Sequence, residues 1–300
     1  MVSYPRACLK ILRDNGAGPL RRAEWLSMYA FARFPRPRLS EGTSRADSPR
    51  RESAGEVPLE PFDEAATLRD LTHQGFAHGL RLSAGSLSAI RGLARERESR
   101  GALHPLAPAY EAAGDPIVAC YEDTAAWAPV EAIALSLHPL ARRALGRGST
   151  LLGSRVWWSF PRKGSAPEEV QTGRRFHFDL YAWRSLSGFF YLTDVDEDAG
   201  PHVCVLGSHR RKALRHQFSA SRWREDAEIE SVYGRGSLLT ILGPAGTGFL
   251  EDPTCLHKAV LPACTPRLVL QLLWGSEDSL APGFSRRFSR TFGRRSDRVR

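Results

Sequence analysis

The chain has 300 residues, of which 42% are hydrophobic and 25% charged, as is typical of a globular protein. No run of about 18 apolar residues occurs, so we expect no membrane span. The five cysteines are scattered and show no Cys-x-x-Cys spacing, which argues against a disulfide scaffold and against a structural zinc site. The first residues lack the long apolar stretch of a secretory signal, so we expect a cytoplasmic protein with reduced thiols.

The formal net charge of +9 is concentrated at one end of the chain. The last seventeen residues carry seven Arg and one Asp, a balance of +6, and the rest of the chain is close to neutral. Such a tail could contact nucleic acid or a membrane surface. We favour the simpler interpretation of a solvated basic C-terminal tail over residues 281–300, and we do not expect nucleic acid as a partner.

The first part of the chain divides into three segments. Residues 1–34 have apolar groups at helical spacing and predict a helical extension. Residues 35–58 are rich in Pro, Ser, Arg and Glu and predict a flexible linker or exposed loop. A single domain is expected over residues 59–280. It begins with a helix from about residue 62, with Asp63 as its N-cap and Gly75 as its end.

Two more helices are predicted at 85–99 and 130–146, and Pro139 could divide the second of them into two pieces. After residue 150 the pattern changes to short β-rich runs separated by Gly, Pro and Asp. This predicts a β-rich α+β protein built on a jelly roll, or double-stranded β-helix, with the helices packed on one sheet. The predicted strands are 151–160, 174–180, 187–193, 202–206, 236–242, 247–250, 255–261 and 267–274.

The candidate site begins with His177 and Asp179. In an extended chain residues i and i+2 point to the same side, so both side chains can reach one metal ion. His257 lies in a later predicted strand and can complete a set of two imidazoles and one carboxylate, which is the facial triad of iron(II) oxygenases. The competing interpretation is a buried histidine bonded to a nearby carboxylate. Arg267 opens an apolar strand and needs an anionic partner if it is buried, such as the far carboxylate of 2-oxoglutarate.

Three stretches carry a family resemblance: HFDLYAW at 177–183, FFYLTDVDEDAGPHVCVLGSHR at 189–210, and CLHKAVLPACTPR at 255–267. Together they resemble the phytanoyl-CoA dioxygenase family over roughly residues 62–275. The resemblance implies a double-stranded β-helix with His177, Asp179 and His257 as catalytic iron(II) ligands. It also implies that Arg267 binds the carboxylate of the cosubstrate 2-oxoglutarate and that Phe189 lies beside it.

The activity implied by the resemblance is that of a dioxygenase. It would hydroxylate a C–H bond of an unidentified small organic substrate and release succinate and carbon dioxide. Related halogenases replace the carboxylate ligand with a small residue, so Asp179 favours hydroxylation over halogenation. The chain departs from the family at Ala259, where a polar residue is usual, and at His202. We expect His209 to stabilise a turn, whereas His202 could line the mouth of the site.

Two further hypotheses remain open at the level of sequence. The chain could be a catalytically silent jelly-roll scaffold that uses its basic tail for an anionic partner, or an oxygenase guided to nucleic acid by that tail. The segment 210–235 lies between strands and is a candidate lid or specificity loop. Trp157 and Trp158 should place one ring on each face of a sheet, one in the core and one beside the substrate.

Overall fold

The computed structural model describes residues 57–105, 111–112, 115–116, 118–146, 148–161, 175–217 and 223–276. The predicted helical extension at 1–34, all but the last two residues of the linker at 35–58, and the basic tail at 281–300 lie outside these residues. The candidate ligands, Arg267 and Phe189 all lie within them.

The three predicted helices are present, and capping residues define the ends of the first one. Helix α3 (Glu64–Gln74) is capped by Asp63, whose carboxylate accepts a hydrogen bond from Ala66 N, and it ends at Gly75 with φ +71°. Helix α4 (Ala84–Ser99) follows it, and α5 (Ala128–Leu145) is the longest of the three. Pro139 does not divide α5 in two, because buried residues on either side of it hold one face of the helix against the sheet.

The larger sheet has seven antiparallel strands in the order β1-β10-β7-β12-β6-β5-β2, and the smaller has three in the order β11-β8-β9. A third, two-stranded unit pairs β3 (Glu111–Ala112) with β4 (Asp115–Pro116). The larger sheet comprises β1 (Phe76–Arg81), β10 (Thr247–Glu251), β7 (Ser185–Tyr191), β12 (Arg267–Ser276), β6 (Ser149–Ser159), β5 (Val118–Tyr121) and β2 (Leu103–Pro105). The smaller comprises β11 (His257–Ala259), β8 (His202–Val205) and β9 (Leu238–Ile241).

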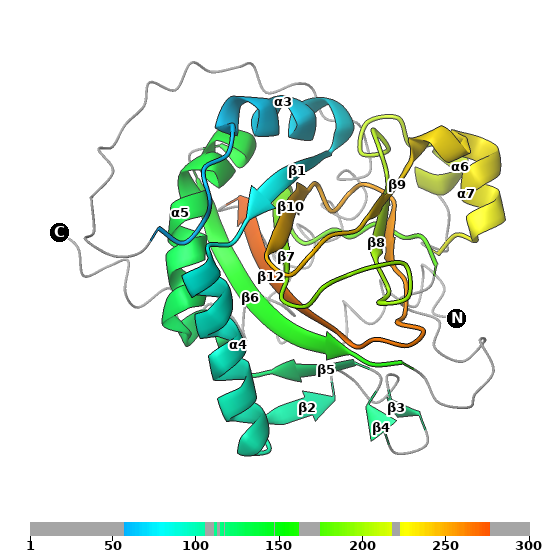
Figure 1. Cartoon of the computed structure of the whole chain (residues 1–300). Coiled ribbons are helices and arrows are strands. Elements are labelled where there is room, and N and C mark those ends of the chain that lie inside the picture. Colours follow the sequence, from blue (N-terminus) through cyan, green and yellow to red (C-terminus); the bar gives the residue numbers. More distant parts are fainter. Residues whose placement is uncertain are drawn as a thin grey trace, which may run out of the picture.

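The two main sheets face each other to form the double-stranded β-helix expected from the sequence (Figure 1). Seven of the eight predicted strands are present with ends shifted by a few residues. The strand predicted at 174–180 is wrong. From residue 175 this segment forms only isolated bridges, Phe176 with Arg224 and His177 with His257, because successive residues pair with two different segments and no ladder continues. Strands β1 to β5 were not predicted.

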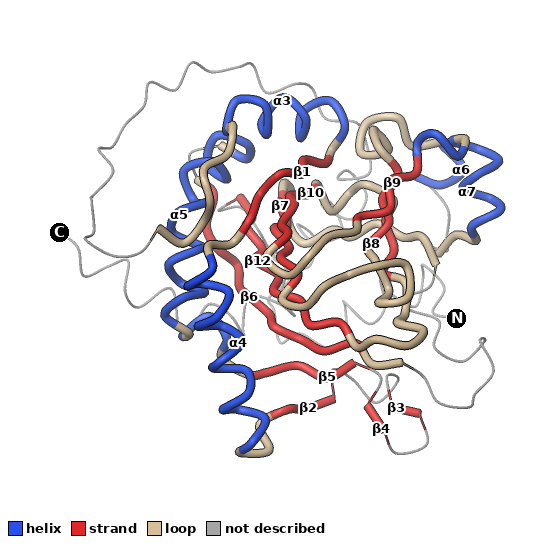
Figure 2. The backbone as a smooth tube through the Cα atoms, in the orientation of Figure 1, coloured by secondary structure: helices blue, strands red, loops and turns tan. Residues whose placement is uncertain are grey.

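The main core lies between the larger sheet and the helices, which cover one of its faces as predicted (Figure 2). Alternate residues of β12 such as Leu270, Leu272 and Trp274 join the helices in this core. Arg267 and Val269 occupy the other alternate positions of β12, so they point to the opposite face and into the space between the sheets. The sheet therefore separates a purely structural layer from an inner layer that holds the candidate site.

The tryptophan pair follows the same alternation. Trp158 packs on the helical side and its indole N–H donates to Glu98 and Tyr121. Trp157 packs on the inner side, with its ring 6.4 Å from that of Phe189. The prediction of one ring on each face is confirmed.

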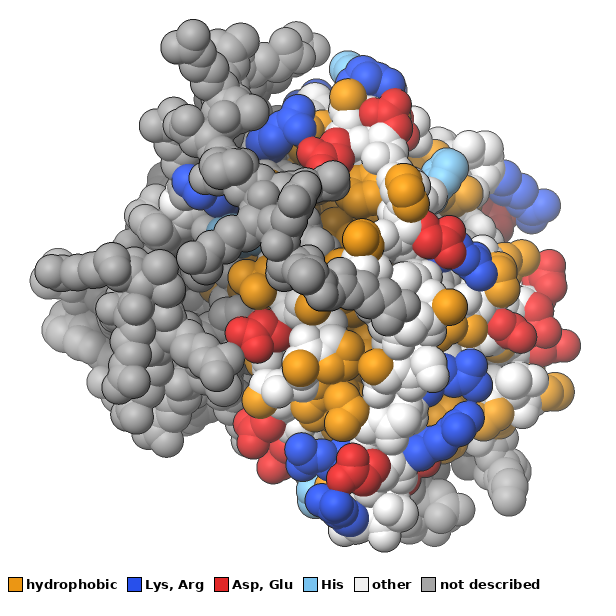
Figure 3. Space-filling model, turned by 60° about the vertical axis from the view of Figure 1, so that its left-hand side comes forward, with side chains coloured by type: hydrophobic (Ala, Val, Ile, Leu, Met, Phe, Trp, Pro, Cys, Tyr) orange, Lys and Arg blue, Asp and Glu red, His pale blue; other side chains and the backbone are white. Residues whose placement is uncertain are grey.

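The described surface on the helical side carries both signs of charge, mixed with apolar side chains (Figure 3). Among the described residues, no helix is long and apolar enough to cross a membrane.

Candidate metal centre

The two candidate histidine ligands are neighbours in one backbone bridge. His177 N donates to His257 O at 2.9 Å, and His257 N donates to His177 O at 2.8 Å. The two ring centroids are consequently 4.6 Å apart. A third backbone bond, from Asp179 N to Pro253 O, holds the rest of the segment against the loop that leads to His257.

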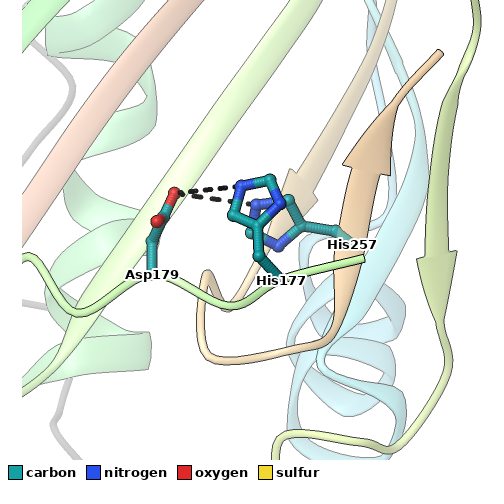
Figure 4. Close-up of side chains that lie close together, drawn as sticks. All are labelled: His177, Asp179 and His257. Carbon is teal, nitrogen blue, oxygen red and sulfur yellow. Dashed lines mark ion pairs between the residues drawn. The ribbon is translucent and has the colours of Figure 1, made fainter. Parts of the chain in front are cut away.

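Asp179 faces both rings. Its Oδ2 atom lies 3.9 Å from His177 Nε2 and 3.7 Å from His257 Nε2 (Figure 4). The three candidate ligand atoms all lie within 4.8 Å of one another, and their side chains are at most 16% exposed. Two Nε2 atoms and one carboxylate oxygen thus converge on one point, which is the arrangement of a facial triad.

The orientation of both rings is fixed by backbone carbonyls. His177 Nδ1 lies 3.1 Å from Arg175 O, and His257 Nδ1 lies 3.0 Å from Cys255 O. A carbonyl oxygen can only accept, so each Nδ1 donates its proton there, and Nε2, which faces Asp179, is the nitrogen left to bind a metal ion. This is the tautomer that a metal-binding histidine requires.

Two residues that were not predicted as ligands contact the triad. The Tyr181 hydroxyl donates to Asp179 Oδ2 at 2.7 Å. The Trp223 ring lies 4.7 Å from the His177 ring, and the neighbouring Arg224 is tied to Phe176 by two backbone bonds. Trp223 therefore forms a wall beside the candidate metal position.

Trp223 belongs to the segment predicted as a lid or specificity loop. The described part of this segment contains α6 (Leu214–Gln217) and α7 (Asp226–Tyr233), and residues 218–222 lie outside the description. Ile229 of α7 is fully buried in a cluster with Phe176 and Phe178. The described part of the candidate lid therefore packs onto the segment that carries His177 and Asp179.

The electrostatic environment favours bound cations. Burial alone would lower the pKa of His257, but the carboxylates of Glu251 and Asp179 raise it to about 9. Burial likewise acts to raise the pKa of Glu251, but His257 and His202 outweigh it and the pKa is lowered. The carboxylates that favour a proton on His257 would equally favour a metal cation in its place.

Arg267 is buried on the inner side of the larger sheet, with 3% of its surface exposed. Its Nε and Nη1 atoms have no hydrogen-bond partner among the described residues. Burial lowers the pKa of this guanidinium to about 10, opposed by the neighbouring Tyr191. A buried guanidinium with unpaired donors fits an anionic ligand such as a carboxylate.

Phe189 lies on the same inner side as Arg267. Its ring is 5.1 Å from that of Phe249 and 5.3 Å from that of His202. The structure therefore gathers Phe189, Arg267 and the triad around the space between the two sheets. Whether Phe189 and Arg267 contact a cosubstrate stays a prediction.

The two other histidines considered in the sequence have different positions. His209 Nε2 lies 3.4 Å from Thr72 O, at a turn packed against Gly75, which agrees with a structural role. His202 is buried, so it does not line an open mouth, and its Nε2 lies 3.0 Å from Oε2 of Glu251. Sequence reasoning missed Glu251, which ends an otherwise apolar strand.

No protein-family model matches the sequence, and no curated protein matches it closely enough to be a relative. Solved structures do match its fold. The non-haem α-ketoglutarate-dependent epimerase SnoN of nogalamycin biosynthesis aligns with a TM-score of 0.51 and 16% identity, over 70% of this chain and 81% of SnoN. AviO1 of Streptomyces viridochromogenes Tue57 aligns with a TM-score of 0.53 and 16% identity, over 73% and 98%.

HygX of Streptomyces hygroscopicus, with nickel, 2-oxoglutarate and hygromycin B bound, aligns with a TM-score of 0.50 and 17% identity, over 70% of this chain and 86% of HygX. The fold of this chain is thus the double-stranded β-helix of iron and 2-oxoglutarate enzymes. The fold implied by the sequence resemblance is confirmed.

Proposed function

We propose that the chain is an iron(II)- and 2-oxoglutarate-dependent dioxygenase that hydroxylates a C–H bond of a small organic substrate, releasing succinate and carbon dioxide. The observation that carries this proposal is the combination of a preformed His-Asp-His triad with a buried arginine on the same inner face, two of whose nitrogen atoms have no hydrogen-bond partner among the described residues. Either feature alone is compatible with a structural role. Together they supply a metal site and an anion site inside one β-helix.

The residues fit the two groups that the fold family implies. His177, His257 and Asp179 would hold the metal on one side and leave its other positions open. Arg267 would bind the far carboxylate of 2-oxoglutarate through its unpaired N–H groups. When bound, iron(II) and 2-oxoglutarate would activate oxygen, which is the oxidant, and oxidative decarboxylation of 2-oxoglutarate to succinate and carbon dioxide would supply two of the electrons.

The protein's own part in the reaction is to orient and to exclude water. The carbonyls of Arg175 and Cys255 keep each Nδ1 protonated, so the metal-facing nitrogens stay available as ligands. The rings of Phe189 and Phe249 make the inner space apolar. An apolar lining strengthens the attraction between Arg267 and a bound carboxylate.

The bound molecules named for similar structures support a small-molecule substrate. SnoN has been solved with Fe³⁺, α-ketoglutarate and nogalamycin RO, and HygX with hygromycin B. Trp223 beside His177 is the described residue best placed to contact such a substrate. The enzymes share only the fold with this chain, so the substrate has to be found by experiment.

One observation favours the alternative of a catalytically silent scaffold. Ala259 stands two residues after His257, where the family resemblance leads one to expect a polar side chain toward the cosubstrate. A scaffold would bind neither iron(II) nor 2-oxoglutarate, so the two hypotheses separate in a binding experiment.

The test is anaerobic titration of the metal-free protein with iron(II) and then with 2-oxoglutarate, followed by visible absorption. An oxygenase gives a charge-transfer band that needs both components, and H177A abolishes it. Absence of the band in the wild-type protein, or its persistence in H177A, would overturn the proposal. Succinate release measured across a panel of small natural products then identifies the substrate class.

A further inference from the structure

Glu251 and His202 form a buried carboxylate–imidazole pair that none of the roles above uses. Glu251 ends β10 and is 1% exposed, and His202 begins β8 with its side chain 8% exposed. Glu251 Oε2 lies 3.0 Å from His202 Nε2. The pair comes from different sheets and crosses the inner space of the β-helix.

The pair is surrounded by apolar rings. The ring of His202 lies 5.3 Å from that of Phe189 and 5.2 Å from that of Phe249. Taking a carboxylate out of water costs several kcal/mol, and replacing a buried ion pair by apolar side chains is often neutral or stabilising. Folding stability alone therefore gives no reason for a buried carboxylate at this place.

The pair lies directly behind a candidate metal ligand. Glu251 Oε1 is 3.7 Å from His257 Nδ1, and the rings of His202 and His257 are stacked with centroids 5.4 Å apart. On the other side of the same imidazole, Nε2 lies 3.7 Å from Asp179. The His257 ring is thus held between two carboxylates, one on the metal side and one behind it.

We propose that Glu251, held by His202, positions His257 and strengthens it as a metal ligand. This inference rests on the proposed function. A negative charge behind a ligand imidazole stabilises the positive charge that the ring acquires when its other nitrogen binds a cation. The carbonyl of Cys255 accepts a hydrogen bond from Nδ1–H of His257, and Glu251 adds a full negative charge at short range in an apolar environment.

The role of His202 is to fix the carboxylate. Its Nε2 lies beside Oε2, whereas Oε1 is the oxygen nearer to His257. Ala259 is the residue directly opposite His202 in the β11–β8 register, so the two share a face of the smaller sheet. The small side chain of Ala259 leaves room for the imidazole of His202. The two departures from the family pattern, Ala259 and His202, thus belong to one arrangement.

The test measures cobalt(II) binding to metal-free protein by calorimetry, together with the visible spectrum of the cobalt(II) form. E251Q keeps the shape and removes the charge. H202L/E251L replaces the pair by apolar side chains, which should leave the metal-free protein folded with an unchanged or higher Tm. D252N is the matched control, because it removes the neighbouring carboxylate, which contacts Thr254.

We expect E251Q and H202L/E251L to bind cobalt(II) about 10- to 100-fold more weakly than the wild type, with an altered cobalt spectrum, and D252N to bind within about twofold. A folded H202L/E251L protein with wild-type affinity and spectrum would overturn the inference and leave the proposed function standing. Wild-type protein that binds no metal would overturn both.

Discussion

His177 and His257 exchange both backbone hydrogen bonds across a single bridge, and this sets the distance between their rings without any metal ion. Their carbonyl-bound Nδ1 atoms fix the ring orientation in the same way. The site is therefore formed by the fold itself. A metal ion that binds this folded site and not the unfolded chain must raise the stability of the protein.

The first prediction follows from that linkage. Metal at 100 times its Kd should stabilise the folded chain by about 2.7 kcal/mol, which corresponds to a rise in Tm of about 5–10 °C for a domain of this size. H257A and D179A should lose the shift in a thermal melt with and without metal. H78A, which changes an exposed histidine on β1, should keep it. A full shift in H257A would place the metal elsewhere.

The second prediction concerns Tyr181, whose hydroxyl donates to Asp179 Oδ2. The bond orients the carboxylate that faces both histidines, so Y181F should weaken metal binding by roughly tenfold. Y233F is the control, because that hydroxyl contacts Ala213 N and His216. Calorimetric titration of both variants checks the difference. Equal affinities in Y181F and the wild type would show that Asp179 needs no such support.

Much of this site was predictable because it depends on local rules. Residues i and i+2 point the same way in any extended segment, so His177 and Asp179 converge although residues 175–180 form no regular strand. The strand pattern likewise predicted the β-helix and the position of Arg267. The caps of α3 at Asp63 and Gly75 were correct for the same reason, since each acts within one turn.

The features that were missed depend on contacts distant in sequence. Glu251 ends an apolar run, which from sequence alone indicates an exposed strand end, and only the pairing of distant strands brings it to His202. Trp223 reaches His177 through the bridge between Arg224 and Phe176. Strand β1 was missed because its register shifts between His78 and Leu80, which breaks the alternation that predicts a strand.

The third prediction concerns pH and Lys212. Its ammonium group lies 4.8 Å from the centre of the Phe178 ring and donates to Ser208 O. Burial lowers its pKa from 10.5 to about 8. Between these two pH values the unfolded chain binds more protons at Lys212 than the folded chain does. The free energy of unfolding therefore rises with pH because of Lys212.

From pH 7 to pH 9 the free energy of unfolding of the wild type should therefore rise by about 1 kcal/mol relative to K212M. Urea denaturation at several pH values measures this difference. Parallel pH profiles of the two proteins would mean that Lys212 titrates in the folded state as it does in the unfolded chain.

The last prediction separates the contribution of Arg267 to binding from its effect on stability. Its unpaired donors should bind the far carboxylate of 2-oxoglutarate, and hydrogen bonds to charged groups contribute about 1.5–3 kcal/mol each. R267M should therefore weaken 2-oxoglutarate binding by at least about tenfold, measured by titrating the charge-transfer band. Metal affinity in the absence of 2-oxoglutarate should not change, because Arg267 is not a ligand.

The same substitution should act in the opposite direction on the protein without ligands. The buried guanidinium has lost its hydration without gaining a charged partner among the described residues, so R267M should unfold at a higher temperature than the wild type. R81M, which removes an exposed arginine paired with Glu60, should change neither quantity appreciably. Wild-type 2-oxoglutarate affinity in R267M would exclude Arg267 as the carboxylate partner, whatever its effect on Tm.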